Sequence, residues 1–379
     1  MQTDMLIRSR SGSPGIPVRP AGALARLMAM TEAPVIGLAG TGDHGLTMGL
    51  LADMLRAGGR NASLGIADSL HQAAGFGPGD RVLIELGTPM LRQVPQGLST
   101  LVLSGLAPDA LAPGQAMADA VDELRRAIAG AGDCVVVNAD DARALALAAE
   151  ARVEVLRVAS ADRHAEAWVR AGELVLVDPL VGIERRVCRL DDCAIGATAY
   201  RSSLLLASAV AVQIGVEVEA IRAAAGAFLP RPGQLDRLES GDRLVWIDGS
   251  SAIRPGPAAD ALRSIAGRRT ILSIAGGRHG GQSLERWARA SADVSDHTLI
   301  FGSGAEALCA ALLRAGASVV RCADLDDAVA SARHLASAGQ SILFAPACDA
   351  DDLDSPRPSE RFRALVTLSD PIGASAEAA

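Results

Sequence analysis

The chain has 379 residues, a formal net charge of −8, and 36 basic side chains that are all arginine. Because aromatic residues make up only 2% of the chain and the net charge is negative, we expect no nucleic-acid partner. The absence of lysine excludes a phosphate-loop lysine, a Schiff base and a carbamylated lysine anywhere in this sequence.

The first half of the chain alternates between predicted strands and helices. A Pro-, Gly- and Ser-rich stretch, 1–33, contains one helical pattern at Ala21–Met30 and is followed by a buried strand at Pro34–Ala39. Further strands are predicted at Arg81–Leu86, Thr100–Leu103, Cys134–Asn138 and Val153–Val158, and helices at Leu46–Ala57, Met117–Ala129 and Ala139–Ala151. This alternation predicts a parallel, doubly wound α/β sheet.

The second half changes character twice. Leu174–Arg189 predicts a hairpin around Asp178-Pro179, and the helices Leu204–Ile214 and Val218–Phe228 lead to a linker at Leu229–Gly233. Strands then resume at Leu244–Asp248, Thr270–Ala275, Thr298–Phe301, Ser318–Cys322 and Ser341–Phe344. We therefore expect an N-terminal remnant at 1–33, a central α/β domain at 34–228, a smaller α/β domain at 229–369 and a disordered tail at 370–379.

Other sequence features indicate a cytoplasmic protein without membrane insertion. No apolar run is long enough to span a bilayer, and Met1–Pro20 lacks the apolar core of a signal peptide. The six cysteines show neither a CxxC pair nor metal-ligand spacing. We interpret them as small buried apolar residues in a reducing compartment.

The glycine-rich turn after the first strand is the candidate binding loop. It lies between a predicted strand and a predicted helix, where a phosphate loop belongs. Its residues are Gly40, Thr41, Gly42, Asp43 and His44. By itself this turn is a weak indication of nucleotide binding.

Together with motifs spread over the whole chain, the turn resembles the Mur ligase family, most closely its D-glutamate-adding branch. The matching motifs are Ser13–Pro17, Glu85, Pro108-Asp109, Asn138–Asp141, Gly215–Ile221, Trp246–Ala252, Ala275–Gly277, Ala345–Cys348 and Arg361–Leu365. The resemblance implies a P-loop-type central domain, a Rossmann-like C-terminal domain and an ATP- and magnesium-dependent ligation of an acid to an amino acid. It also implies a magnesium-associated role for Glu85 and a place near the adenine for Asn138.

The residues that carry out this chemistry in the family are replaced here. His44 stands at the position of the phosphate-binding lysine, Gly45 at that of the magnesium-holding hydroxyl, and Leu124 at that of the carbamylated lysine. Asp43 adds a negative charge worth on the order of 1–4 kcal/mol against a phosphate a few ångströms away. The further departures from family motifs are Ala110, Ala112, Ala199-Tyr200, Pro232-Gly233-Gln234 and Gly249–Arg254.

These departures favour a fold retained without its chemistry. We predict no catalytic residues and no cofactor, with Gly40–His44 and Asn138 as a vestigial nucleotide site and Glu85 as a vestigial metal ligand. Glu85 is interpreted as a solvent-facing strand end, and Asn138–Asp141 as a turn and helix N-cap. The family's UDP-binding domain is represented only by Ser13–Met30, so either that domain is lost or the true start lies upstream.

Three hypotheses stay open. The first is a pseudoenzyme that binds cell-wall synthesis or division proteins. The second is an active ATP- and magnesium-dependent ligase in which Arg125, Arg201 or Arg254 supplies positive charge while Glu85 and Asp109 hold the metal ion. The third is a small-molecule binder that uses Leu229–Gly233 as a hinge between its domains.

Overall fold

The chain forms two compact units in the computed structural model. The described residues are 20–65, 69, 72, 75–87, 91, 97–111, 114–178, 181–193, 200–229, 231–265, 271–350 and 358–367. The first unit comprises the described residues of Met1–Leu106, Ala116–Gly196 and Tyr200–Leu229; the second comprises those of Ala107–Gln115 and Pro230–Ala379.

The first unit is built on a sheet whose described strands run in the order β2-β3-β1-β4-β5-β6-β7-β8-β9. The strands are β1 (Val35–Ala39), β2 (Ala62–Leu64), β3 (Arg81–Glu85), β4 (Leu98–Leu103), β5 (Ala131–Asn138), β6 (Glu154–Ala159), β7 (Ala167–Arg170), β8 (Glu173–Val177) and β9 (Glu184–Arg189). Along this order, each strand from β2 through β1 to β7 pairs in parallel with its neighbours in that part of the sheet. Strand β8 pairs antiparallel with both β7 and β9. Every residue of β1 is buried, as expected for a central strand of a parallel sheet covered on both faces.

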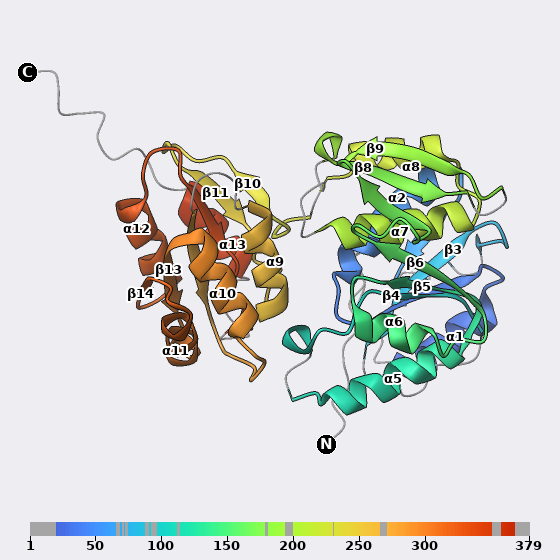
Figure 1. Cartoon of the computed structure of the whole chain (residues 1–379), viewed down its shortest axis with the longest axis horizontal. Helices are drawn as coiled ribbons and strands as arrows, with labels where there is room; N and C mark the ends of the chain where they lie inside the picture. Colours follow the sequence, from blue (N-terminus) through green and yellow to red (C-terminus); the bar gives the residue numbers. More distant parts are fainter. Residues whose placement is uncertain are drawn as a thin grey trace, which may run out of the picture. The chain divides into compact units, whose positions relative to one another are not determined.

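Helices cover both faces of this sheet (Figure 1). One face carries α2 (His44–Ala57), α7 (Arg201–Gln213) and α8 (Val218–Ala227), which pack against one another. The other carries α5 (Met117–Ala129) and α6 (Ala142–Ala148), and α1 (Pro20–Met30) also belongs to this unit. Because Ser203–Ala211 is buried throughout, α7 is buried around its whole circumference rather than along one stripe.

The second unit has its own sheet, in the order β10-β11-β15-β12-β13-β14 among the described strands. Its strands are β10 (Asp236–Leu238), β11 (Val245–Asp248), β12 (Ile271–Gly276), β13 (Ser295–Phe301), β14 (Val319–Arg321) and β15 (Ser341–Phe344). Its helices are η2 (Pro108–Ala110), α9 (Pro255–Ile265), α10 (Glu285–Val294), α11 (Ala305–Ala315), α12 (Leu325–Leu335) and α13 (Pro358–Thr367).

The core of the second unit lies on two sides of its sheet. One cluster contains Trp287 with apolar residues of α9, α10 and α11. The other contains Trp246, Phe344 and Phe362 with apolar residues of α12. The Trp246 and Phe362 rings meet edge to face with centroids 6.0 Å apart, and the Arg333 guanidinium lies 4.9 Å from the Trp246 ring centroid.

The α/β class and the predicted sequence of strands and helices are confirmed, including the antiparallel pairing within Leu174–Arg189. The predictions missed the short strands β2, β7 and β10, which have three or four residues each and no clear alternation. Ser13–Pro17, Ala112, Pro179, Ala199, Pro230 and the tail 370–379 lie outside the described residues.

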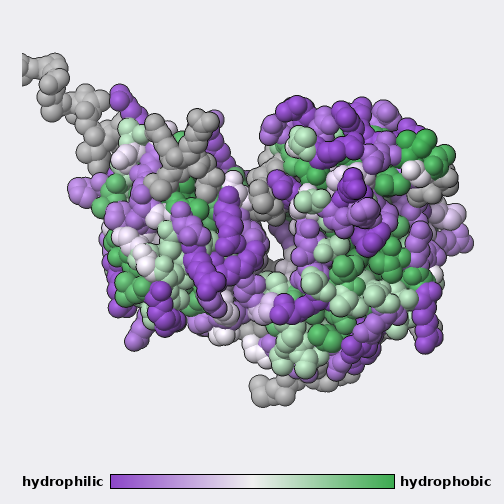
Figure 2. Space-filling model, in the orientation of Figure 1, coloured by the Kyte–Doolittle hydropathy of each residue, from purple (hydrophilic) through white to green (hydrophobic). Residues whose placement is uncertain are grey.

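The surface of each unit mixes polar and apolar residues on the face shown in Figure 2. Among the exposed large hydrophobic residues are Val181 and Ile183, which precede β9. In the described part of the chain, no helix has the length and apolar character needed to cross a membrane.

Candidate functional site

The glycine-rich turn joins β1 to α2 and packs against the chain that follows β4. A Cβ atom on Gly40, which has a φ of 110°, would lie 2.4 Å from the carbonyl oxygen of Gly105. A Cβ atom on Gly42 would lie 2.7 Å from the Cβ of Ser104. Both glycines are therefore required by the close approach of two backbone segments, independently of any ligand.

The backbone amides of this turn donate hydrogen bonds within the chain. The four donor–acceptor pairs are Thr41 N to Gly105 O at 3.0 Å, Gly42 N to Ser104 Oγ at 3.0 Å, His44 N to Gly42 O at 3.1 Å and Leu46 N to Asp43 Oδ1 at 2.8 Å. A phosphate cradle works in the opposite way, because its amides point their hydrogens at the anion. These four amides are engaged by the protein itself.

Asp43 is the N-cap of α2. Its carboxylate accepts the amide hydrogen of Leu46, and its carbonyl oxygen accepts hydrogen bonds from the Thr47 amide and hydroxyl. The helix consequently begins at His44, two residues before the predicted start at Leu46. The capping carboxylate lies at the positive end of the helix dipole, where a bound anion would otherwise lie.

The His44 side chain is nearly buried, with 7% of its surface exposed, and both ring nitrogens contact protein atoms. Nδ1 lies 3.2 Å from Glu85 Oε1, and Nε2 lies 2.9 Å from Ser104 Oγ. Because a carboxylate oxygen can only accept, Nδ1 carries a hydrogen and donates it to Glu85. The ring therefore connects the ends of β3 and β4 and directs neither nitrogen at a nucleotide.

Glu85 is the last residue of β3, and its side chain is 59% exposed, which confirms its interpretation as a solvent-facing strand end. The hydrogen bond from His44 lowers the pKa of this carboxyl below its ordinary value. The histidine thus gives Glu85 a hydrogen-bond donor at the place where the family resemblance implies a magnesium ion.

Replacing His44 by alanine is expected to raise the Glu85 pKa toward its ordinary value, because the carboxylate loses its main stabilising hydrogen bond. A depressed carboxyl pKa adds stability above the unfolded-state pKa, and that stability is lost as the pH falls through the folded-state pKa. The acid-side loss of stability should therefore become shallower in His44→Ala. NMR titration of the Glu85 carboxyl carbon measures the change in its pKa. The control variant His297→Ala, in the second unit, should leave the Glu85 pKa unchanged.

Asn138 and Asp141 form the predicted turn and N-cap. Asn138 Nδ2 donates to the carbonyl oxygen of Ser104 at 3.2 Å, and Asn138 Oδ1 accepts the Asp140 amide. Asp141 caps α6 by accepting the amides of Arg143 and Ala144. The other Asp141 oxygen accepts the Leu106 amide at 2.7 Å. These contacts support the turn after β4 rather than leaving groups directed at a base.

The remaining family positions in the first unit have structural roles. Leu124 is 2% exposed and contributes to the apolar face of α5. The neighbouring Arg125 pairs with Glu150 at 2.7 Å and with Asp122 at 3.2 Å on the exposed side. Arg201 begins α7, and its Nε is buried without a hydrogen-bond partner.

In the second unit, the charged candidates are also paired. Asp109 is 6% exposed and lies 3.4 Å from Arg286, which also contacts Asp260. Arg254 donates to Asp349 at 2.6 Å. Arg254 and Asp109, which the rebuilt-site hypothesis assigns to an active site, are therefore neutralised by partners within the second unit.

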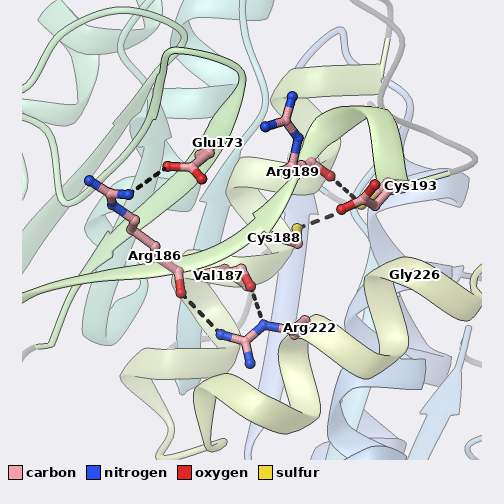
Figure 3. Close-up of a pocket in the computed structure, with 9 residues that line it drawn as sticks. Glu173, Arg186, Val187, Cys188, Arg189, Cys193, Arg222 and Gly226 are labelled. Carbon is pink, nitrogen blue, oxygen red and sulfur yellow. Dashed lines mark hydrogen bonds and ion pairs between the residues drawn. The ribbon is translucent and has the colours of Figure 1, made fainter.

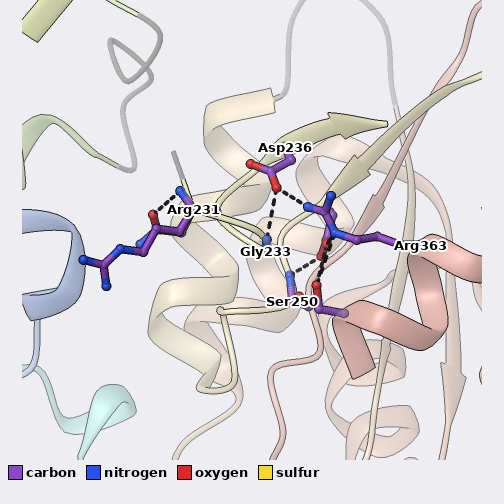
Figure 4. Close-up of polar contacts among 8 residues, drawn as sticks. Arg231, Gly233, Asp236, Ser250 and Arg363 are labelled. Atoms are coloured by element: carbon purple, nitrogen blue, oxygen red, sulfur yellow. Dashed lines mark hydrogen bonds and ion pairs between the residues drawn. The ribbon is translucent and has the colours of Figure 1, made fainter. Parts of the chain in front are cut away.

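The segment at the family's Pro-x-Arg position is held to neighbouring backbone (Figure 4). Gly233 has a φ of 88°, and a Cβ on it would lie 2.7 Å from Ser250 Oγ. Its amide donates to Asp236, which in turn pairs with Arg363. Gln234 receives the Arg231 amide on its side-chain oxygen. Figure 4 shows these contacts grouped around Gly233 and Arg363.

The donor set around the loop does not fit ATP with magnesium. The amides of Thr41, Gly42, His44 and Leu46 donate to the chain itself, Glu85 is hydrogen-bonded to His44, and Gly45 has no side-chain oxygen. No group of three or more His, Cys, Asp or Glu residues with metal-binding geometry occurs in the described part of the chain. Sequence reasoning missed Ser104, whose hydroxyl joins the loop, His44 and Ala39; its position directly after β4 was the available indication.

Comparisons with known proteins agree with the fold. A UDP-N-acetylmuramoylalanine–D-glutamate ligase from Frankia casuarinae is 32% identical over 338 residues, which cover 84% of this chain and 68% of the relative. The corresponding ligase from Symbiobacterium thermophilum is 28% identical, over 87% of this chain and 74% of its own. The MurF ligase from Thermotoga maritima, solved in complex with ADP, superposes with a TM-score of 0.66 at 12% identity, covering 95% of this chain and 87% of its own. No family model matches the chain.

A parallel central sheet, a second α/β unit and these similarities define the class: the chain belongs to the Mur ligase family. Within that family it is similar to the ligases that join UDP-N-acetylmuramoylalanine to D-glutamate.

Proposed function

We propose that this chain is a non-catalytic member of the Mur ligase family that acts by binding in peptidoglycan-precursor synthesis. The observation that carries the proposal is the set of four loop amides that donate to acceptors of the chain itself. An anion would have to displace each of those acceptors before the turn could cradle a phosphate. Two of these acceptors, Gly105 O and Ser104 Oγ, belong to buried residues, and leaving a buried group without its partner costs about 1–3 kcal/mol.

Charge supports the same proposal. The loop and its surroundings place the carboxylates of Asp43 and Glu85 beside the helix N-terminus, and His44 is held between Glu85 and Ser104. Phosphoryl transfer depends on cations positioned on the phosphates. A lysine-free chain with this loop supplies none at the position that the family uses.

The partner class that suits this proposal is another protein of cell-wall synthesis or cell division. A family fold that keeps its surface but not its turnover can compete with an active ligase for shared partners. The alternative is an active ligase with a rebuilt site. Two of the cations considered for it, Arg125 and Arg254, are each paired with a carboxylate. The candidate metal ligand Asp109 is paired with the guanidinium of Arg286.

Calorimetric titration with magnesium and ATP tests the proposal. We expect the wild-type chain to bind more weakly than about 1 mM, because its loop donors are engaged. The double variant His44→Lys, Gly45→Thr should bind at least roughly tenfold more tightly, since it adds a cation and a hydroxyl and removes the histidine from Glu85. A matched variant, His297→Lys, changes the same charge in the second unit and should not bind.

Turnover is measured beside binding. Wild-type protein given magnesium, ATP, UDP-N-acetylmuramoyl-L-alanine and D-glutamate should release no phosphate above the background without acceptor. Nucleotide-dependent amide formation, or a wild-type dissociation constant for ATP well below about 1 mM, would establish the rebuilt-site alternative instead.

A further inference from the structure

A pocket of about 430 Å³ lies in the first unit, and none of its lining residues belongs to the glycine-rich turn (Figure 3). It is formed by the end of β9, the short helix η3 (Leu190–Asp192) and α8. The residues that matter here are Arg186, Cys188, Arg189, Cys193 and Arg222. Two cysteines thus share one pocket with three arginines, an arrangement that sequence spacing did not indicate.

The two sulfur atoms are already close. Cys188 Sγ lies 3.6 Å from Cys193 Sγ, whereas a disulfide bond is about 2.05 Å long. The intervening turn is held by hydrogen bonds from Leu190 N to Gly172 O at 2.8 Å and from Cys193 N to Leu190 O at 3.1 Å. A small rotation of the side chains would therefore join the sulfurs without rebuilding the backbone.

The two thiols are not equivalent. Either thiol can donate in the contact between them; this contact lowers the Cys193 pKa, and together with burial it raises the Cys188 pKa. Cys193 is therefore the sulfur that reaches the thiolate form first, and the thiolate is the nucleophile in disulfide exchange. Cys188 keeps its proton and is placed to react second.

The arginines give the pocket a chemical preference. Arg222 donates to the carbonyl oxygens of Val187 and Arg186, which fixes its guanidinium against β9. Arg186 pairs with Glu173 at 3.4 Å, and Asp192 adds a second carboxylate to the lining. Arg189 pairs with Asp191 at 3.6 Å, so the positive charge that a carboxylate-bearing ligand would meet is that of Arg222, whose described hydrogen bonds go to carbonyl oxygens. The volume is within the range of pockets that bind small molecules.

We propose that Cys188 and Cys193 form a redox-active dithiol that exchanges with a small, carboxylate-bearing disulfide. The Cys193 thiolate attacks one sulfur of that disulfide, its S–S bond breaks, and one small thiolate leaves and takes a proton from water. Cys188 then loses its proton to water and attacks the Cys193 sulfur of the mixed disulfide, expelling the second small thiolate. The chain is oxidised by two electrons, and the small disulfide is reduced to two thiols.

Glutathione disulfide serves as the probe, with alkylation of remaining thiols and mass spectrometry of the full chain. The wild type should lose two hydrogens, localised to a Cys188–Cys193 bond. Cys188→Ser should stop at one glutathione adduct on Cys193, and Cys193→Ser should react at least tenfold more slowly than the wild type. Cys309→Ser, in the second unit, should behave as wild type. These variants do not touch the glycine-rich turn, so the result is independent of the proposed loss of catalysis.

Comparing a charged with an uncharged disulfide tests the preference of the pocket for carboxylates. Arg222→Gln should slow the reaction with glutathione disulfide several-fold but leave the reaction with uncharged bis(2-hydroxyethyl) disulfide unchanged. An equal effect on both disulfides would refute the carboxylate preference. The dithiol site would be overturned by a wild-type chain in which Cys309 is modified while Cys188 and Cys193 stay reduced, or by a Cys193→Ser variant that forms an adduct on Cys188 as fast as the wild type reacts.

Discussion

Replacing Gly40 by alanine should destabilise the first unit by about 3 kcal/mol. The φ of 110° is a conformation that side-chain-bearing residues adopt only at a cost of about 1–3 kcal/mol. In addition, the new Cβ would lie 2.4 Å from the Gly105 carbonyl oxygen, so the segment after β4 would have to move. Overpacking of this kind costs about 1–3 kcal/mol. Urea unfolding measures the change.

Gly59→Ala is the matched control for this prediction. Gly59 also has a positive φ, 75°, but a Cβ there would meet nothing within 4 Å. It should therefore show only the conformational cost, about 1–2 kcal/mol. If the two variants were equally stable, packing against Gly105 would not be the reason for a glycine at position 40. The comparison matters for function, because it separates a glycine kept for the fold from one kept for a phosphate.

Replacing Asp248 by alanine should destabilise the second unit by about 3–5 kcal/mol. Asp248 is fully buried, and one of its oxygens accepts the Ser250 amide at 3.0 Å. The other accepts the Ser359 hydroxyl and Arg363 Nε, each at 2.8 Å. Without the carboxylate, Arg363 loses one of its two negative partners in a largely desolvated place, which is the costly way to break an ion pair.

Asp326→Ala provides the control, because its partner Arg361 lies on the same helix as Arg363. Asp326 pairs with Arg361 of α13 through both of its oxygens, but both side chains are about half exposed. An exposed pair contributes about 0–1 kcal/mol, so this variant should unfold almost as the wild type does. Tryptophan fluorescence follows unfolding in both cases, and Trp246 and Trp287 are its contributors in the second unit. A similar loss in the two variants would mean that burial does not decide the strength of these pairs.

The family and the α/β architecture could be predicted from the sequence because both depend on local, repeated signals. The apolar run of β1 and the spacing of Met117–Ala129 specify a strand and a helix whatever lies around them. The departures at His44, Gly45 and Leu124 were likewise visible, because a missing lysine or hydroxyl removes a chemical capability directly. Strands as short as β7 lack such a signal, and only pairing with β6 and β8 makes them strands.

Hydrogen-bond partners, in contrast, were decided by the tertiary structure. The sequence by itself determined that a histidine occupies the loop; the packing of β1 between β3 and β4 brought Glu85 and Ser104 to its two nitrogens, across 41 and 60 residues of chain. In the same way Asn138 met the carbonyl oxygen of Ser104, 34 residues away along the chain. Such contacts join groups that are neighbours in space only after the sheet has formed, so no local pattern records them.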